Sequence, residues 1–190
     1  MNAPDRAASP TNNYVTRPMA FAGAFDDEVC DRIVRLGLSR PGKAHSLDYG
    51  GPDSRLASSH WIARDAGSEW LFERLHATFL KTNQWYDFDL DEMREPLLFA
   101  HYPPGPGFTW HLDTLDGLSS RRKISMSIQL SGPAEYDGGE LEFIPDGVLQ
   151  LSRVRGTLIA FPSVCAHRVT PITRGARNSL VAWMHGPPFR

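Results

Sequence analysis

The chain has 190 residues, 41% of them hydrophobic, and a formal net charge of -2 from 20 Lys and Arg and 22 Asp and Glu. This length allows one ordinary globular domain with a buried core and leaves no room for a second catalytic domain. The balanced charge excludes the one-signed field that drives non-specific binding to nucleic acid or to an anionic membrane. We therefore expect neither as a partner.

The location of the protein is predicted from what the sequence lacks. The longest early apolar stretch, residues 19–25, is interrupted by Gly23 and is too short for a secretory signal or a membrane span. Only Cys30 and Cys165 occur, and a chain of this length builds its core without disulfides, so both thiols are expected to be reduced. We expect a cytoplasmic protein, and no pattern indicates its oligomeric state.

The N-terminal half predicts a tail followed by helices. Residues 1–17 are rich in Ala, Pro, Asn and Thr without periodicity, which predicts a flexible tail before a single domain over 18–190. Within a helical region at 26–90, the run from Asp26 to the Pro41-Gly42 pair has apolar residues at helical spacing behind an acidic first turn. The sequence predicts a longer helix over 67–86, after a loop at 46–54 and a strand near 59–63.

The region 96–190 has a different texture. Short runs rich in β-branched or aromatic residues alternate with turn clusters. These runs are PLLFAHY, FTWHL, KISMSIQL, ELEFI, GTLIAFP, HRVTPI and SLVAWM. So many short strands without βαβ alternation predict an antiparallel sandwich or barrel and disfavour a Rossmann-type fold. The expected fold is mainly β with N-terminal helices: a double-stranded β-helix, or cupin-like jelly roll, with the helices against one sheet.

A pair of potential metal ligands occurs in the segment FTWHLDT. His111 and Asp113 are two residues apart, so on an extended strand both side chains point to the same face. An exposed polar pair at a strand edge has the same spacing, and the pair alone does not establish a metal site. A third ligand is needed.

His167 is the candidate for that third ligand. It follows the apolar strand GTLIAFP, and a jelly roll brings a late strand back beside the first ones. Two imidazoles and one carboxylate on one face of an octahedral ion leave open positions, as in non-haem iron(II) oxygenases. Zinc prefers a tetrahedral site with more nitrogen or sulfur donors. Cys165 could supply such a donor if its strand is regular, although a small buried hydrophobic residue is the favoured interpretation.

Arg177 and Ser179 are the candidates for binding an anion. Arg177 follows His167 by ten residues and Ser179 lies two further on, on the same strand face. A guanidinium can hold a carboxylate through two parallel hydrogen bonds, and a hydroxyl can add a third. This is what the far end of a dicarboxylate requires while its keto-acid end chelates a metal. A solvated arginine beside Gly175 is the alternative interpretation.

These motifs resemble a known family. The series WHLD, RKISMSIQLS, YDGGELEF, GTLIAFP and HRVTPITRGARNSLVAW, over residues 96–190, is similar in order and spacing to the prolyl-4-hydroxylase-like and PKHD-type 2-oxoglutarate and iron(II)-dependent oxygenases. The N-terminal half is similar only loosely, mainly in TNQWYDFDL before EPLLFAHY. The C-terminal region that many PKHD-type members carry has no room in this chain, so their substrate does not transfer with the resemblance.

The resemblance implies a role for each matching residue. His111, Asp113 and His167 correspond to the iron ligands, and Arg177 corresponds to the partner of the 2-oxoglutarate C5 carboxylate. Ser179 matches the serine of an Arg-x-Ser pair that assists it. The remaining matches fall where such enzymes line the co-substrate pocket, with roles that vary across the group: Tyr102, Gln129 and Trp183. The implied activity is a hydroxylation that consumes 2-oxoglutarate and dioxygen and releases succinate and carbon dioxide, with ascorbate as a possible reductant.

Other polar residues have structural interpretations. Residues 137–139, Asp-Gly-Gly, predict a turn, which in the family lies near the mouth of the site. Trp110 should point away from the metal, toward the core or a substrate wall, and residues 121–123 form a basic run expected on a solvated face or beside the mouth. The remaining histidines lack ligand spacing and are interpreted as ordinary polar or packed residues: His45, His60, His76, His101 and His185.

Two other functions are open at this point. One is a non-catalytic jelly roll that binds a metal or a ligand, which would chelate iron and 2-oxoglutarate without turnover. The other is a cysteine hydrolase built on Cys165, although no nucleophile motif surrounds this residue. For the oxygenase, the substrate is either a peptidyl side chain or a free small molecule such as an amino acid or a natural product.

Overall fold

The computed structural model describes residues 17–46, 55–144, 147–148 and 153–189. Most of the predicted tail and most of the predicted loop at 46–54 therefore lie outside the described residues. Both predicted helices are confirmed, as α1 (Asp27–Leu38) and α2 (Glu69–Tyr86), and a short 3-10 helix (Gly117–Arg121) follows later. In the described part of the chain, no helix is long and apolar enough to cross a membrane.

The strands of the described residues form three antiparallel sheets. Their bounds are β1 (Met19–Phe21), β2 (Gly42–Ser46), β3 (Arg55–Ile62), β4 (Leu97–Tyr102), β5 (Phe108–His111), β6 (Arg122–Gln129), β7 (Tyr136–Gly138), β8 (Leu141–Phe143), β9 (Gly147–Val148), β10 (Leu158–Pro162), β11 (His167–Val169), β12 (Ile172–Gly175) and β13 (Arg177–His185). The large sheet has the order β1-β10-β6-β13-β4-β3-β2, and the smaller sheets are β5-β11-β8-β9 and β12-β7.

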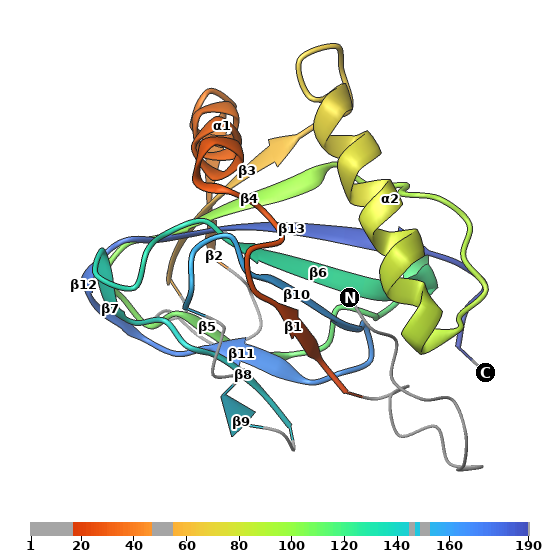
Figure 1. Cartoon of the computed structure of the whole chain (residues 1–190). Helices are drawn as coiled ribbons and strands as arrows, with labels where there is room; N and C mark the ends of the chain where they lie inside the picture. Colours follow the sequence, from red (N-terminus) through yellow and green to blue (C-terminus); the bar gives the residue numbers. More distant parts are fainter. Residues whose placement is uncertain (1–16, 47–54, 145–146, 149–152, 190) are drawn as a thin grey trace.

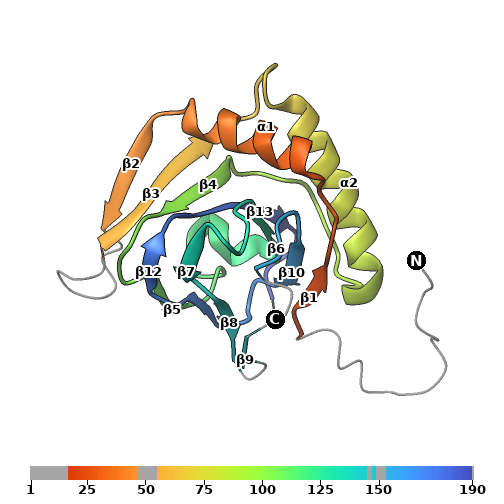
Figure 2. The ribbon, with the colours of Figure 1, turned by 60° about the vertical axis from the view of Figure 1, so that its left-hand side comes forward.

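The large sheet and the smaller sheets are arranged in layers. Figure 1 shows both helices on one side of the large sheet and the short strands β5, β8 and β11 on the other side. In Figure 2, turned by 60° about the vertical axis, the large sheet curves around the smaller ones while α1 and α2 cover its outer side. The predicted double-stranded β-helix with helices against one sheet is confirmed.

The large sheet is buried on both faces, and each face has its own apolar core. Along β10, Leu158 and Ala160 belong to the core under the helices, whereas Ile159 and Phe161 belong to the core shared with the smaller sheets. This follows from the alternation of side chains along a strand. The inner core is where polar side chains of the same strands can meet the smaller sheets.

Helix α1 begins and ends as its sequence predicts. The Asp26 side chain accepts a hydrogen bond of 2.8 Å from the backbone N–H of Val29, which caps the first turn. Near the C-terminal end, Gly37 lies against the ring of Phe99 on β4: a Cβ atom at Gly37 would be 2.3 Å from the ring's Cγ. The helix therefore approaches the sheet so closely at position 37 that no residue larger than glycine fits there without a shift.

Four strands lie wholly outside the runs that were predicted to form strands. β1, β2, β7 and β9 have the sequences MAF, GKAHS, YDG and GV, which are short and lack the runs of β-branched or aromatic residues that identify a strand. They form because the backbone of a longer neighbouring strand is available for pairing: β1 pairs with β10, and β7 pairs with β12. Of the predicted turn at 137–139, the first two residues thus belong to the end of β7, and Gly139 follows it.

Replacing Gly37 tests the packing of α1 on the sheet. We expect Gly37→Ala to lower the free energy of unfolding by about 1–3 kcal/mol, because the added methyl group overlaps the ring of Phe99. Gly67→Ala is the matched control, since its Cβ would meet Asp65 Oδ1 at 3.4 Å, an ordinary contact. Urea unfolding measures both, and equal stability of the two variants would contradict the close approach.

Candidate functional site

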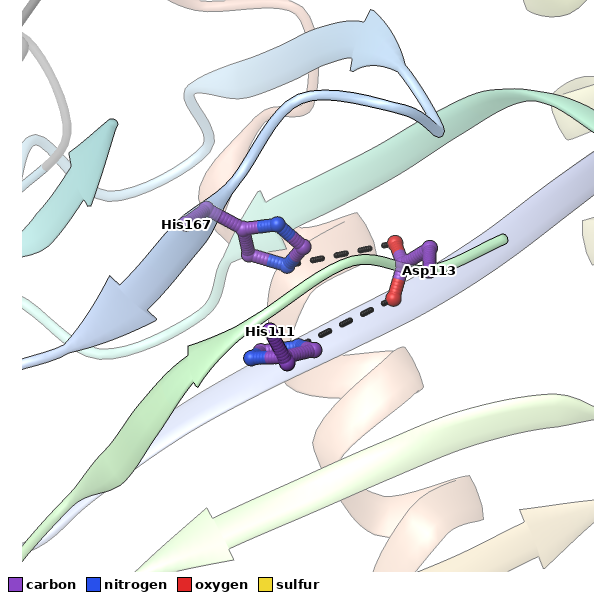
Figure 3. Close-up of side chains that lie close together, drawn as sticks. All are labelled: His111, Asp113 and His167. Carbon is purple, nitrogen blue, oxygen red and sulfur yellow. Dashed lines mark ion pairs between the residues drawn. The ribbon is translucent and has the colours of Figure 1, made fainter. Parts of the chain in front are cut away.

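Three potential metal ligands converge on the inner side of the fold. His111 ends β5 and His167 begins β11, and the two residues are register partners in the antiparallel pair. Asp113 follows just beyond the end of β5, and Figure 3 shows both imidazole rings directed toward its carboxylate. The separations are 3.8 Å from His111 Nε2 to Oδ1 and 3.9 Å from His167 Nε2 to Oδ2. These distances exceed a hydrogen bond, and one ion could contact all three groups.

Each imidazole is oriented by a backbone carbonyl. His111 Nδ1 lies 2.8 Å from the carbonyl oxygen of Thr109, and His167 Nδ1 lies 3.0 Å from that of Cys165. A carbonyl only accepts, so Nδ1 carries the hydrogen in both rings and the Nε2 lone pair faces the site. Histidine ligands of protein-bound metals are held in the same way.

The electrostatics of the three groups fit a divalent cation. Burial lowers the pKa of His111 to about 4, and the neighbouring His167 acts in the same direction. Burial would raise the pKa of Asp113, but the two imidazoles and the neighbouring polar side chains together outweigh it, and the pKa is lowered. Asp113 Oδ2 is buried without a hydrogen-bond partner. Two imidazole nitrogens and one carboxylate with an unsatisfied oxygen are a donor set for a transition-metal ion.

A cavity of about 230 Å³ opens beside the three ligands. It lies between the large sheet and the sheet of β5 and β11, and its lining is mainly apolar. Besides the three potential ligands, the predicted site residues that line it are Tyr102, Arg177, Ser179 and Trp183. Strand alternation explains this, because Arg177, Ser179 and Trp183 occupy odd positions of β13 and point inward together.

Arg177 is a buried cation in this cavity. Its side chain is only 2% exposed, and its NH1 donates to Ser179 Oγ at 3.3 Å. Tyr102 is its register partner on β4, with the ring centre 5.5 Å from the guanidinium carbon. The Nε atom is buried without a partner, and among the described residues no carboxylate forms an ion pair with Arg177. A buried guanidinium in this state is ready to receive an anion.

Gln129 lies behind the cavity instead of in its lining. Its amide nitrogen donates to the backbone oxygen of Ser131 at 2.9 Å and to the hydroxyl of Tyr136 at 3.0 Å. The side chain is 1% exposed, and its carbonyl oxygen has no hydrogen-bond partner within the described structure. Gln129 thus supports the strands around the site from within the core.

Trp61 was not singled out from the sequence, and Gly139 was singled out only as part of a turn near the mouth of the site. Trp61 on β3 lines the cavity and is 37% exposed, with its ring 6.2 Å from that of Trp183. Gly139 has a φ of 67° and lies directly behind Arg177: a Cβ there would be 3.1 Å from Arg177 Cδ. The Asp-Gly-Gly pattern predicted the turn, but only the fold reveals that this turn supports the arginine.

The basic run at 121–123 is paired and packed. Arg121 forms an ion pair of 2.6 Å with Asp91, and the Lys123 ammonium lies 3.8 Å from the ring centre of Phe189. Arg122 lines the cavity and forms an ion pair with an acidic residue. The alternative of a freely solvated basic face is wrong for this run, because neighbouring acidic and aromatic side chains engage all three residues.

The remaining histidines of the described residues lie outside the site. His60 bonds to the backbone oxygen of Arg40 at 2.8 Å, and His101 bonds to Asn178 at 2.7 Å. His185 bonds to Glu95 at 2.9 Å, and His76 is exposed on α2. These are the ordinary polar and packed roles that were predicted for them. The side chain of one further histidine, at position 45, lies outside the described residues.

Cys165 and Trp110 adjoin the site without lining the cavity. Cys165 is 7% exposed and packs in the inner core, and in the described chain neither it nor Cys30 forms a disulfide. Trp110 points away from the metal ligands, as predicted: it is 38% exposed, with the Arg168 guanidinium carbon 4.9 Å from its ring centre. Its exposure agrees with neither core packing nor a wall of the cavity.

Comparison with known proteins identifies the family. Residues 97–185 match the family described as the 2OG-Fe(II) oxygenase superfamily. A PKHD-type hydroxylase of Paraburkholderia phytofirmans is 40% identical over 173 residues, covering 80% of this chain and 72% of the relative. A PKHD-type hydroxylase of Burkholderia ambifaria is 34% identical over 167 residues, covering 82% and 71%.

Solved structures share the fold. A Pseudomonas putida prolyl-4-hydroxylase superposes with a TM-score of 0.72 at 24% identity, covering 90% of this chain and 94% of that one. A Trichoplax adhaerens prolyl hydroxylase, in complex with a hypoxia inducible factor oxygen degradation domain peptide fragment, gives a TM-score of 0.70 at 14% identity, covering 88% and 83%.

The fold and the site thus define a non-haem oxygenase with a jelly-roll core. The chain belongs to the 2-oxoglutarate- and iron(II)-dependent oxygenases, among the PKHD-type hydroxylases. Iron(II), 2-oxoglutarate and dioxygen are the cofactors and co-substrates of this class, and the donor set of His111, Asp113 and His167 fits such an ion.

The low pKa of His111 predicts how the stability of the metal-free protein depends on pH. Its folded pKa, about 4, lies below the ordinary value of 6.5, so the unfolded chain takes up the proton first as the pH falls. Stability contributed by His111 is therefore lost between about pH 6.5 and pH 4, by up to ~1.4 kcal/mol per pH unit. Urea unfolding of chelator-treated protein across this range should show a shallower loss in His111→Gln.

The control for this measurement is His76→Gln, which removes an exposed histidine of α2. It reports the effect of deleting an imidazole as such. An identical pH dependence in wild type and His111→Gln would contradict the low pKa of His111.

Proposed function

We propose that this protein hydroxylates an unactivated C–H bond of a small molecule or a peptidyl side chain, and converts 2-oxoglutarate to succinate and carbon dioxide in the same cycle. One observation carries the proposal: the cavity that contains the three potential metal ligands also contains a buried arginine with an unsatisfied donor. A metal ion and a dicarboxylate together would satisfy both ends of this cavity.

In this proposal His111, Asp113 and His167 hold the iron. The carbonyls that fix both Nδ1 atoms keep the two Nε2 lone pairs directed at the ion, and the ionised carboxylate of Asp113 offsets part of its charge. When bound, iron(II) and 2-oxoglutarate supply the oxidative chemistry, with one oxygen atom of dioxygen entering succinate and the other entering the product. The protein supplies orientation and a site from which water is excluded.

Arg177 and Ser179 would bind the distal carboxylate of 2-oxoglutarate. A guanidinium buried without a counter-ion is costly, and a carboxylate that enters beside it restores the charge balance through charge-assisted hydrogen bonds. Tyr102 and Trp183 would form further parts of the co-substrate pocket, in accord with their positions in the cavity lining. Gln129 would act from behind the pocket through its bond to Tyr136.

The group that is hydroxylated would be apolar and uncharged. Part of the cavity wall is formed by Trp61, Val181 and Trp183, which favour an apolar surface. The Trichoplax neighbour is in complex with a peptide fragment, which supports including peptidyl side chains in the proposal. Free small molecules with an apolar end are also part of the proposal, because the same apolar wall would bind them.

The proposal places the reaction in the cytoplasm, in accord with two cysteines that form no disulfide in the described chain.

The competing function is a jelly roll that binds metal and 2-oxoglutarate without turnover. Incubation with iron(II), ascorbate and 2-oxoglutarate against a panel of peptides and small molecules separates the two, because only the enzyme releases succinate above the metal-free background.

Removing any one of the three ligands should abolish turnover. We expect His111→Ala, Asp113→Ala and His167→Ala each to weaken iron binding at least tenfold, or ~1.4 kcal/mol, because each variant loses one of three direct ligands. Calorimetric titration of the metal-free protein with anaerobic iron(II) measures this, and circular dichroism verifies the fold. His76→Ala, which removes an exposed histidine, is the control.

Retention of wild-type iron affinity by His167→Ala would show that another residue is the third ligand. We also expect zinc to occupy the site without producing succinate, because the reaction requires a redox-active ion. Turnover by a zinc-loaded, iron-free preparation would contradict the oxygenase proposal.

Arg177→Ala should weaken 2-oxoglutarate binding while leaving the metal site intact. Loss of a charge-assisted contact in a shielded pocket costs on the order of 2 to 5 kcal/mol, or roughly thirtyfold or more in affinity. Arg177→Lys should recover only part of this, since an ammonium cannot reproduce the planar fork. The measurement is titration of 2-oxoglutarate into the anaerobic iron(II) protein, followed by the metal-to-ligand charge-transfer absorption.

The matched control is Arg174→Ala, three residues earlier, whose guanidinium forms an exposed ion pair with Asp137. It should leave the 2-oxoglutarate midpoint unchanged. An unchanged midpoint in Arg177→Ala itself would show that another residue binds the distal carboxylate.

A further inference from the structure

Asp113 is the one potential ligand that no strand holds. His111 and His167 are fixed by the pairing of β5 with β11, but β5 ends at His111 and Asp113 lies in the irregular segment beyond it. Two hydrogen bonds restrain its backbone instead. The Asp113 N–H donates to the carbonyl of Ser163 at 3.1 Å, and NH1 of Arg122 donates to the Asp113 carbonyl at 3.0 Å.

Arg122 is itself tightly held. Its Nε donates to Glu95 Oε1 at 2.8 Å, and its NH2 bonds to the other oxygen of the same carboxylate. Both side chains are largely buried, at 15% and 12% exposure. Glu95 Oε1 also lies 2.9 Å from Nε2 of the fully buried His185. A bidentate guanidinium with a carboxylate anchored from behind has little freedom to move.

The same guanidinium supports a wall of the cavity. Its central carbon lies 3.8 Å from the ring centre of Trp183, which in turn is 6.2 Å from Trp61. Trp183 Nε1 is buried without a hydrogen-bond partner. Arg122 therefore contacts both the backbone of one ligand and the indole beside the site.

Burial would raise the pKa of Glu95, but the hydrogen bonds from Arg122 and His185 outweigh it and lower the pKa to about 2. The carboxylate is thus ionised at every physiological pH, and the charge of Arg122 is matched within the protein. A guanidinium that already has its counter-ion is suited to holding neighbouring groups in place, not to binding a substrate anion.

We propose that Arg122, anchored by Glu95, is a positioning residue that holds Asp113 in its metal-binding geometry and fixes the Trp183 wall. This inference rests on the proposed metal site. It predicts that the loss of the guanidinium weakens metal binding although Arg122 is not a ligand. Partners of this indirect kind typically change metal affinity by about 10–100-fold.

The test is calorimetric titration of metal-free protein with cobalt(II), which reads the site without turnover. We expect Arg122→Met to bind cobalt(II) at least tenfold more weakly than wild type and to shift its visible absorption, because Asp113 is no longer held. Arg122→Lys should recover part of the affinity, since an ammonium can still reach the carbonyl. Arg121→Met is the matched control: Arg121 pairs with Asp91 and not with Glu95, so cobalt(II) binding by this variant should match wild type.

Thermal unfolding in a chelator separates positioning from folding. If Arg122→Met is too unstable to titrate, Glu95→Gln is the second variant: it weakens the anchor but keeps the guanidinium, and should lower cobalt(II) affinity severalfold. Wild-type affinity and spectrum in the folded Arg122 or Glu95 variants would overturn the proposal, as would an Arg122→Lys variant no better than Arg122→Met. Failure of the wild-type protein to bind cobalt(II) would instead overturn the metal site itself.

Discussion

The register between β5 and β11 is the constraint on which the site depends. His167 is paired with His111 in that register, so a shift by one residue would turn one imidazole to the outer face of the sheet. On that outer face the same strands present Trp110 and Arg168, which are in contact with each other. The alternation that exposes Trp110 therefore also directs the two histidines inward, and the packing of the outer pair and the metal site depend on the same register.

The large sheet contributes the other half of the site through the same alternation. On β13 the inward positions carry Arg177, Ser179 and Trp183, while Leu180 and Ala182 pack under the helices. The core under the helices holds the strands of the large sheet in place, so the inward side chains of β13 have fixed positions relative to β5 and β11. Helix α1, which packs closely on the sheet at Gly37, stabilises the strands that carry the site without contacting the site itself.

Much of the site could be predicted because its spacing is local. His111 and Asp113 are separated by two residues, as are Arg177 and Ser179, and a period of two is enough to place each pair on one strand face. His167 could be joined to them only through the expected jelly roll and the family resemblance. The fold class was predicted for a similar reason, since β4, β6, β10 and β13 are rich in β-branched and aromatic residues.

What could not be predicted depends on contacts between segments distant in the sequence. Glu95 and Arg122 are 27 residues apart, and nothing in either neighbourhood indicates that they meet. Trp61 comes from a strand that the sequence placed only approximately, and Gln129 has the inward spacing of a pocket residue yet does not line the cavity. Tertiary packing sets the register of a strand and the position of each residue along it. The two-residue spacing in the sequence therefore predicts which face of the strand a side chain lies on, but not its distance from the metal.

Arg122 and Arg177 illustrate how the surroundings of a residue decide its role. Both are buried arginines that line one cavity, and their side chains alone would suggest two anion sites. Glu95 neutralises the first, whereas the second donates only to the uncharged Ser179 within the described structure. In the proposed function, a dianionic co-substrate that enters the cavity would therefore be drawn to the arginine without a carboxylate, with its other end toward the three potential metal ligands. On this proposal, the direction of the co-substrate would be set by the one of the two guanidinium charges that no carboxylate of the described structure matches.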